Sequence, residues 1–167
     1  MQKNKKISVK FIVISALIAA LYVALTLIFA PISFKEIQFR VSEVLTLLPI
    51  VSLPAVPGLF IGCFIANLIA GALWQDVLFG SLATLLAAVL TRFLRRFPWL
   101  AAFMPVLVNG LVVGYLLVNV YQIPFLKFWV AAGSVAIGEA AVIYMLGLPF
   151  IGIIKKTLNP KMLEGEI

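Results

Sequence analysis

The stretch from Lys10 to Ala30, KFIVISALIAALYVALTLIFA, carries its only charge at the first position and is apolar almost throughout. A helix that crosses a bilayer needs about 20 mainly apolar residues. Over the 167-residue chain, 64% of the residues are hydrophobic and 11% are charged, whereas soluble proteins average roughly 45–50% apolar and 25% charged residues. A soluble domain could not bury this much apolar surface. The sequence therefore predicts an all-α integral membrane protein.

The scarcity of reactive residues excludes several classes of function. Because the chain has no histidine, it cannot form His-ligated zinc or haem sites or a His-based catalytic triad. Its single cysteine, Cys63, excludes a disulfide framework and a multi-cysteine metal site. The sequence also lacks any Gly-Lys pair, and with it the phosphate-binding loop of ATPases. We therefore expect no catalytic residue, cofactor or metal, and work against a gradient would need a partner protein.

Six apolar segments follow one another and predict a single domain of six transmembrane helices over residues 1–167. The second segment is short, and Pro49, Pro54 and Pro57 interrupt its end, so we expect it to cross tilted or to bend into the third. No internal repeat is visible in the sequence. The predicted spans cover residues 10–30, 41–53, 55–73, 77–94, 100–121 and 128–154.

Positive charges lie mainly on one side of these segments. With the N-terminus inside, ten of the 13 Lys and Arg residues lie on inner segments, and only Lys35, Arg40 and Lys127 lie on outer loops. Lys and Arg are enriched on the cytoplasmic side of membrane proteins. We therefore expect a multi-pass protein of the cell membrane with both termini in the cytoplasm. This topology explains the net charge of +7 without nucleic-acid binding.

Some polar residues fall inside predicted spans, where they are unfavourable, and three of them are candidates for a binding site. A carboxylate at the centre of a membrane helix costs about 2.5–3.5 kcal/mol on insertion scales, and such residues commonly have a functional role. Glu139 lies near the middle of the sixth segment among small residues, and we expect it to contact a ligand or a proton. A buried hydrogen bond to another helix is the alternative. For Asn109 on the fifth segment and Asn67 on the third, a structural hydrogen bond to another helix is a stronger alternative than it is for Glu139.

A second polar group lies at the expected outer surface. It comprises Arg40 and Glu43 around the start of the second segment, and Trp74 and Asp76 ahead of the fourth. Arg40 and Glu43 are three residues apart, so on a helix they could simply pair. If the two outer loops meet over the bundle, they would instead cover a pocket whose floor includes Glu139. Trp74 could then stack on a planar ligand.

Small residues repeat every four positions on two segments, a pattern that lets helix backbones approach closely. The stripes are Ala16, Ala20 and Ala24 on the first segment, and Gly58, Gly62, Ala66 and Ala70 on the third. We expect the third-segment stripe to pack inside the bundle. For the first segment, internal packing and contact with an external partner are both open.

Three motifs resemble the queuosine-precursor transporter family. They are RVSEVLTLLP at residues 40–49, PGLFIGCFIAN at 57–67 and DVLFGSLATL at 76–85. With the chain length and the number of predicted spans, the resemblance extends over nearly the whole sequence. It implies a six-helix bundle that acts as the substrate-capture S-component of an energy-coupling factor (ECF) transporter.

The resemblance also implies partners and a substrate. An S-component binds a micronutrient from outside and docks on a transmembrane coupling protein that carries two cytoplasmic ATPases. S-components typically dock through an Ala-x-x-x-Ala motif on the first helix, which here matches Ala16, Ala20 and Ala24. The implied substrate is a 7-deazaguanine, in the first place 7-aminomethyl-7-deazaguanine, with the nitrile form and queuine as alternatives.

The polar residues offer hydrogen bonds that suit such a ligand. A guanine-like edge presents two parallel N–H donors, which one carboxylate accepts in a bidentate manner, and we assign Glu139 to this role. Asp76 or Glu43 would neutralise a cationic aminomethyl group. Asn109 or Asn67 would bind the ring carbonyl.

Other functions are compatible with parts of the sequence. An S-component for another vitamin would have the same composition. A stand-alone transporter that uses Glu139 as a proton-binding carboxylate would explain one buried acid, although the lack of a visible repeat and the polar outer loops argue against it. A membrane enzyme would need paired acid and base groups, whereas only one acid lies deep in a predicted span.

Overall fold

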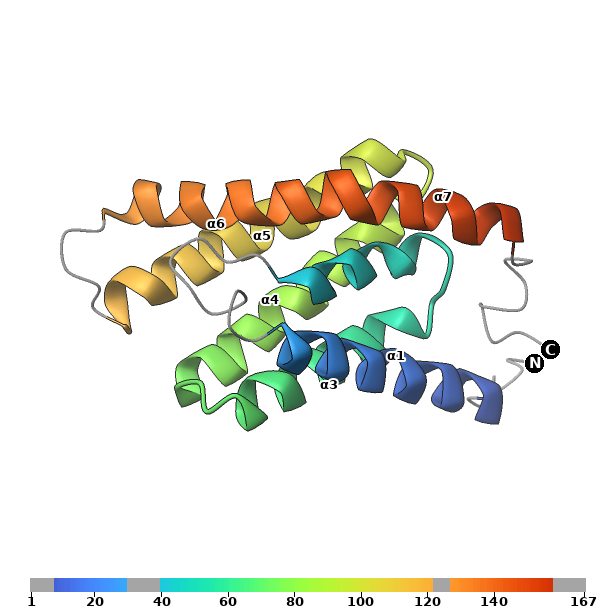
Figure 1. Cartoon of the computed structure of the whole chain (residues 1–167), viewed down its shortest axis with the longest axis horizontal. Coiled ribbons are helices and arrows are strands. Elements are labelled where there is room, and N and C mark those ends of the chain that lie inside the picture. The colour runs from blue at the N-terminus through green and yellow to red at the C-terminus, as the bar shows by residue number, and fades with distance from the viewer. Residues whose placement is uncertain (1–7, 30–39, 122–126, 158–167) are drawn as a thin grey trace, which may run out of the picture.

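The computed structural model describes residues 8–29, 40–121 and 127–157, and all regular structure within these ranges is helical. A ten-residue 3₁₀ helix, η1, and a short π-helical turn, η2, accompany the α-helices. The helices α6, η2 and α7 follow one another without a break and form one long rod (Figure 1). The elements in chain order are α1 (Val9–Ile28), η1 (Val41–Ile50), α3 (Ala55–Ile69), α4 (Trp74–Phe93), α5 (Pro98–Asn119), α6 (Phe128–Val142), η2 (Ile143–Gly147) and α7 (Leu148–Thr157).

Four helices are long and apolar enough to cross a membrane. They are Val9–Ile28, Trp74–Phe93, Pro98–Asn119 and the continuous helix Phe128–Thr157. The all-helical, multi-pass class predicted from the sequence is therefore confirmed. The predicted count of six spanning helices is not confirmed, because η1 and α3 have only 10 and 15 residues.

The third helix ends at Ile69, before the predicted boundary at residue 73, because a backbone cap stops it. Gly71 adopts a φ of 71°, in the left-handed region that favours glycine. The N–H of Ala72 donates to the carbonyl oxygen of Asn67 at 3.0 Å. This bond and the left-handed glycine form a Schellman motif, a common helix terminator.

The fourth helix begins earlier than predicted, at Trp74 rather than at residue 77. Trp74 and Asp76, which we expected on an outer loop, lie in its first turn. Arg40 was likewise expected on an outer loop, but it caps the N-terminus of η1 and its side chain is only 7% exposed. These polar residues therefore lie at the N-terminal ends of η1 and α4 and not on loops.

The 3₁₀ helix η1 lies in the middle of the bundle (Figure 1). Eight of its ten residues are buried, and it packs against α1, α3, α4, α5 and the rod of α6, η2 and α7. Pro49 lies inside η1, and Pro54 caps the start of α3. Proline lacks the N–H that a longer helix would need, so these residues keep η1 short and turn the chain back into α3.

Small residues bring neighbouring helices into close contact. A Cβ atom on Gly58 would lie 2.7 Å from the backbone oxygen of Ser15, and one on Gly62 would lie 2.9 Å from Cβ of Tyr22. The predicted internal role of the α3 stripe is thus confirmed at its contact with α1. Between α5 and α6, a Cβ atom on Gly114 would lie 2.7 Å from the backbone of Ala132.

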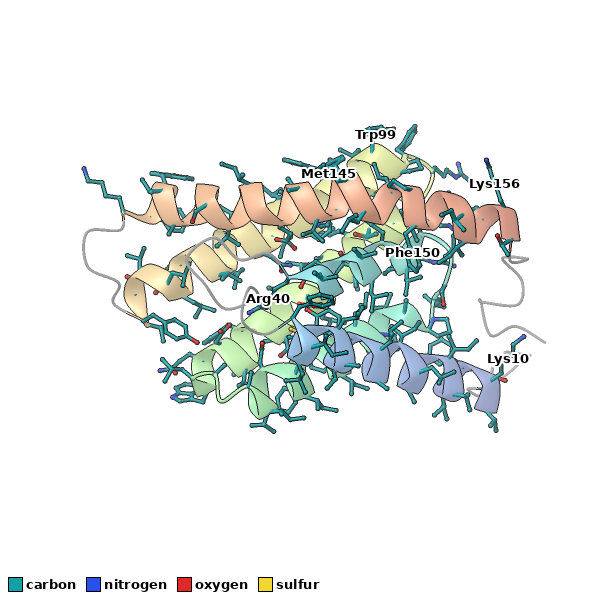
Figure 2. All side chains as sticks on the ribbon, viewed as in Figure 1. Lys10, Arg40, Trp99, Met145, Phe150 and Lys156 are labelled. Carbon is teal, nitrogen blue, oxygen red and sulfur yellow. The ribbon has the colours of Figure 1, made fainter. Side chains whose placement is uncertain are left out.

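Basic side chains gather at one end of the bundle. Figure 2 shows Lys10, on α1, and Lys156, on α7, at the same end of the bundle, whereas Arg40 lies near the centre. Arg92, in the last turn of α4, donates a 3.2 Å hydrogen bond to the carbonyl oxygen of Pro49. This distribution suits a cytoplasmic position of that end.

Candidate functional site

A small polar cavity of about 10 Å³ lies between η1, α4, α5 and α6. This volume is roughly that needed for one water molecule, so a bicyclic ligand would have to spread the surrounding side chains. Four residues singled out in the sequence line the cavity, although they come from different parts of the chain. The polar lining residues are Arg40, Glu43, Thr84, Asn109 and Glu139.

Glu139 lines this cavity from α6 and is only 4% exposed. Nδ2 of Asn109, on α5, donates to Oε1 of Glu139 at 2.6 Å. The alternative of a hydrogen bond to a neighbouring helix is therefore observed, while the expected contact of Glu139 with a ligand or a proton stays a prediction. Gly110 supports the contact between α5 and α6, because a Cβ atom there would lie 3.1 Å from Cβ of Ala136 on α6.

Glu43 reaches the same cavity from η1 and is 3% exposed. The hydroxyl of Tyr22 on α1 donates to Oε1 of Glu43 at 2.6 Å. Arg40 lies three residues earlier, and residues at positions i and i+3 of a 3₁₀ helix lie on the same side. Its guanidinium interacts electrostatically with the carboxyl groups of Glu43 and Asp76.

The carboxyl groups of Glu43 and Glu139 are in hydrogen-bonding contact with each other. Their Oε2 atoms are buried, and no N–H or O–H donor from the described residues reaches them. Two carboxylates this close together and away from water cannot both remain charged. Such an arrangement favours one proton shared between the two groups.

A layer of weaker hydrogen bonds lies between α3 and α4. Oγ1 of Thr84 donates to Sγ of Cys63 at 3.3 Å, and Nδ2 of Asn67 lies 3.6 Å from the same sulfur. Asn67 is buried at 1% exposure, but it is not part of the cavity lining. Its position thus supports a structural role more directly than a contact with the cavity.

Asp76 lies in the first turn of α4 and, like Asn67, is not among the residues that line the cavity. The hydroxyl of Tyr121 donates to Oδ2 of Asp76 at 2.9 Å, whereas Oδ1 is buried without a donor among the described residues. Oδ1 lies beside Gly80, a cavity-lining residue, and a Cβ atom on Gly80 would come within 2.8 Å of it. The absence of a side chain at Gly80 therefore leaves room for the Asp76 carboxylate beside a residue that lines the cavity.

Trp74 lies away from this site. Its side chain is 67% exposed and it is not among the residues that line the cavity. Residues two positions apart on a helix point to different faces, so the inward direction of Asp76 turns Trp74 outward. The position of Trp74 thus does not provide the stacking surface that we expected from the sequence.

The alanine stripe of α1 faces away from the bundle. Ala16, Ala20 and Ala24 are all exposed, whereas Ala19 and Tyr22 face α3 and η1. Internal packing within the described part of the chain therefore does not explain the stripe.

Tyr22 is a site residue that the sequence analysis missed. Ser15, Tyr22 and Thr26 are spaced by seven and four residues and are all buried, so they form a polar stripe on one face of an otherwise apolar helix. That spacing was the available signal. Thr26 confirms the pattern, since its hydroxyl donates to Oγ of Ser42 on η1 at 2.8 Å.

Comparison with known proteins assigns the chain to a family. A family model described as QueT transporter matches residues 12–156, which include most of α1 and nearly all of α7. The chain is 32% identical over 158 residues to the queuosine precursor transporter QueT of Lactococcus lactis subsp. cremoris (strain MG1363), a match that covers 84% of this chain and 90% of the relative. No solved structure matches the chain. The chain therefore belongs to the QueT transporter family, a family of transporters and not of enzymes.

Proposed function

We propose that this chain captures a queuosine precursor of the 7-deazaguanine type from outside the cell, in the first place 7-aminomethyl-7-deazaguanine. The observation that carries the proposal is the buried polar cavity between η1, α4, α5 and α6, in a member of a transporter family whose relative carries this substrate in its name. Buried carboxyl groups inside a membrane bundle are unfavourable unless they have a role.

The side chains around the cavity suit the chemistry of a deazaguanine. A buried carboxylate of this cavity, on Glu43 or Glu139, accepts the N–H donors of the guanine edge. Asn109 lies within hydrogen-bonding distance of Glu139 and binds the ring carbonyl or holds Glu139 in place. One carboxylate oxygen of Asp76 has no donor within the described ranges, and this carboxylate neutralises the ammonium of an aminomethyl group. Arg40 compensates the excess of acidic groups.

The second part of the proposal concerns transport. We propose that the chain acts as the S-component of an ECF transporter and moves its substrate inward together with a transmembrane coupling protein and two cytoplasmic ATPases. The exposed stripe Ala16, Ala20 and Ala24 supports this, because small residues let another helix approach closely in a membrane. The basic end of the bundle, and with it both termini, lies in the cytoplasm in this arrangement.

Calorimetry on the detergent-purified chain tests the substrate. The ligand panel contains 7-aminomethyl-7-deazaguanine, its 7-cyano analogue, queuine, guanine and riboflavin. Saturable, tight binding of one deazaguanine supports the proposal. Binding of riboflavin alone would instead make the chain an S-component for another vitamin.

Uptake into proteoliposomes tests the mechanism. The proposal requires that uptake depends on the coupling protein, the two ATPases and ATP. A stand-alone, proton-coupled transporter would take up substrate without these partners when a pH gradient is applied. Uptake by the chain alone under that gradient would contradict the S-component assignment.

A further inference from the structure

The two carboxyl groups of the cavity have different neighbours. Glu43 lies one helical turn after Arg40, whose guanidinium interacts with it electrostatically, and it accepts a hydrogen bond from Tyr22 at 2.6 Å. Short O–H···O bonds of this length are typical of charged acceptors. Glu139 lies on α6, and the described donor nearest to it is the neutral amide of Asn109.

The contact between the two carboxyl groups needs one proton, because neither Oε2 atom has a donor within the described ranges. The negative charge is more stable on the group that lies closer to a cation and to an O–H donor. Arg40 acts electrostatically on both carboxyl groups, but Glu43 lies one turn after it and is the one that accepts the O–H of Tyr22. The neutral acid can donate its O–H to the Glu43 carboxylate while its other oxygen accepts from Asn109, which is the arrangement that Glu139 offers.

The other titratable side chains around the pair are consistent with a negative charge on Glu43 and a proton on Glu139. Tyr22 on α1, Cys63 on α3, Arg40 before η1 and Asp76 on α4 all interact electrostatically with one another or with the pair. With Tyr22 and Cys63 in their neutral forms, the charged groups are one guanidinium, the Asp76 carboxylate and one charge on the pair. Their sum is one negative charge, which matches a ligand with a single positive charge.

We infer that Glu43 is the anion of this cavity and that Glu139 is a neutral acid that donates a hydrogen bond. The consequence for ligand recognition rests on the proposed function. A carboxylate beside a carboxylic acid presents acceptors next to a donor. A guanine-type edge has two N–H donors beside a carbonyl acceptor. When it binds, its N–H groups replace the O–H of Glu139 as donors to Glu43, and that O–H turns to donate to the ligand carbonyl. An adenine-type edge has its donor and acceptor in the opposite order, so it does not match this arrangement.

In this inference Glu139 donates a hydrogen bond to the ligand, which is the opposite of the acceptor role that we assigned to it from the sequence.

Two isosteric substitutions separate these roles. The amide in Glu139→Gln can still accept from Asn109 and donate to Glu43, whereas Glu43→Gln removes the charge that pairs with Arg40. We expect Glu43→Gln to raise the dissociation constant of 7-aminomethyl-7-deazaguanine about 10- to 100-fold, and Glu139→Gln to raise it less than tenfold. Glu139→Ala, which removes the donor, should weaken binding more than Glu139→Gln. A larger loss in Glu139→Gln than in Glu43→Gln would overturn the inference.

Infrared spectroscopy of the purified chain gives a second test that needs no ligand. A protonated carboxylic acid has a carbonyl stretch that neither a carboxylate nor an amide shares. We expect this band in the spectrum of the unsubstituted protein and of the control Asp76→Asn, and we expect it to be missing from the spectrum of Glu139→Gln. A band that persists in Glu139→Gln would contradict the inference, and this readout decides even if Glu43→Gln does not fold. If the unsubstituted protein binds no deazaguanine, the proposed function fails, but the infrared result still tests whether the two carboxyl groups share a proton.

Discussion

The phenol oxygen of Tyr22 lies 2.6 Å from Oε1 of Glu43 and donates its hydrogen to that carboxyl group. This bond connects α1 to the buried helix η1. On the opposite face of α1, Ala20 and Ala24 are exposed. One side chain therefore links the helix that presents the alanine stripe to the polar cavity.

Replacing Tyr22 with phenylalanine tests the contribution of this bond. Tyr22→Phe keeps the ring and its packing but leaves Oε1 of the buried Glu43 without its donor. We expect the free energy of unfolding to fall by about 1–3 kcal/mol, as measured by denaturant titration in detergent. The control is Tyr115→Phe, since Tyr115 lies on α5 and is 56% exposed. Equal stabilities of the two variants would contradict this role of Tyr22.

The close contact between α1 and α3 predicts a strong effect of a single methyl group. In Gly62→Ala the new Cβ would lie 2.9 Å from Cβ of Tyr22 and 3.0 Å from the backbone oxygen of Ala19. The helices would have to separate, so we expect a loss of about 1–3 kcal/mol in the free energy of unfolding. Gly152→Ala is the matched control, because a Cβ at that position of α7 meets no atom within 4 Å. It should stabilise the helix by about 0.5–1 kcal/mol, and a loss in both variants would refute the contact argument.

Hydrophobic length was enough to locate most helices from the sequence. All predicted segments except the third agree with the observed helices to within three residues at each end, because a run of apolar residues has to be helical in a bilayer. The end of α3 depended on Gly71 and its left-handed backbone conformation. A hydropathy pattern does not report such a conformation. The early start of α4 follows from that cap.

The gathering of Arg40, Glu43, Asn109 and Glu139 around one cavity followed from the sequence, since isolated polar groups in a bundle are unfavourable and find one another. The directions in which individual side chains point could not be predicted from the sequence. Trp74 points away from the cavity because the register of α4 is set by its first turn.

The charge of Asp76 predicts a preference between two forms of the ligand. Asp76→Asn keeps the shape and the contact with Tyr121 but removes the charge that would pair with an ammonium group. We expect the affinity for 7-aminomethyl-7-deazaguanine to fall about 10-fold or more, while the affinity for the uncharged 7-cyano analogue changes less. Calorimetry with both ligands measures this ratio. Tyr121→Phe retains the charge and should leave the ratio near that of the unsubstituted protein, whereas an equal loss for both ligands in Asp76→Asn would exclude this pairing.

The exposed face of α1 predicts a variant that separates binding from transport. Ala20 is exposed, so Ala20→Phe should fold normally and bind the substrate with unchanged affinity in detergent. A bulky side chain there would prevent close approach of a coupling protein, and we expect ATP-driven uptake in proteoliposomes to be lost. Val130→Phe is the control, since Val130 is 59% exposed on α6, and it should retain uptake. If Ala20→Phe loses binding and uptake together, the substitution disturbs the fold. If it retains both, the coupling protein docks on another surface.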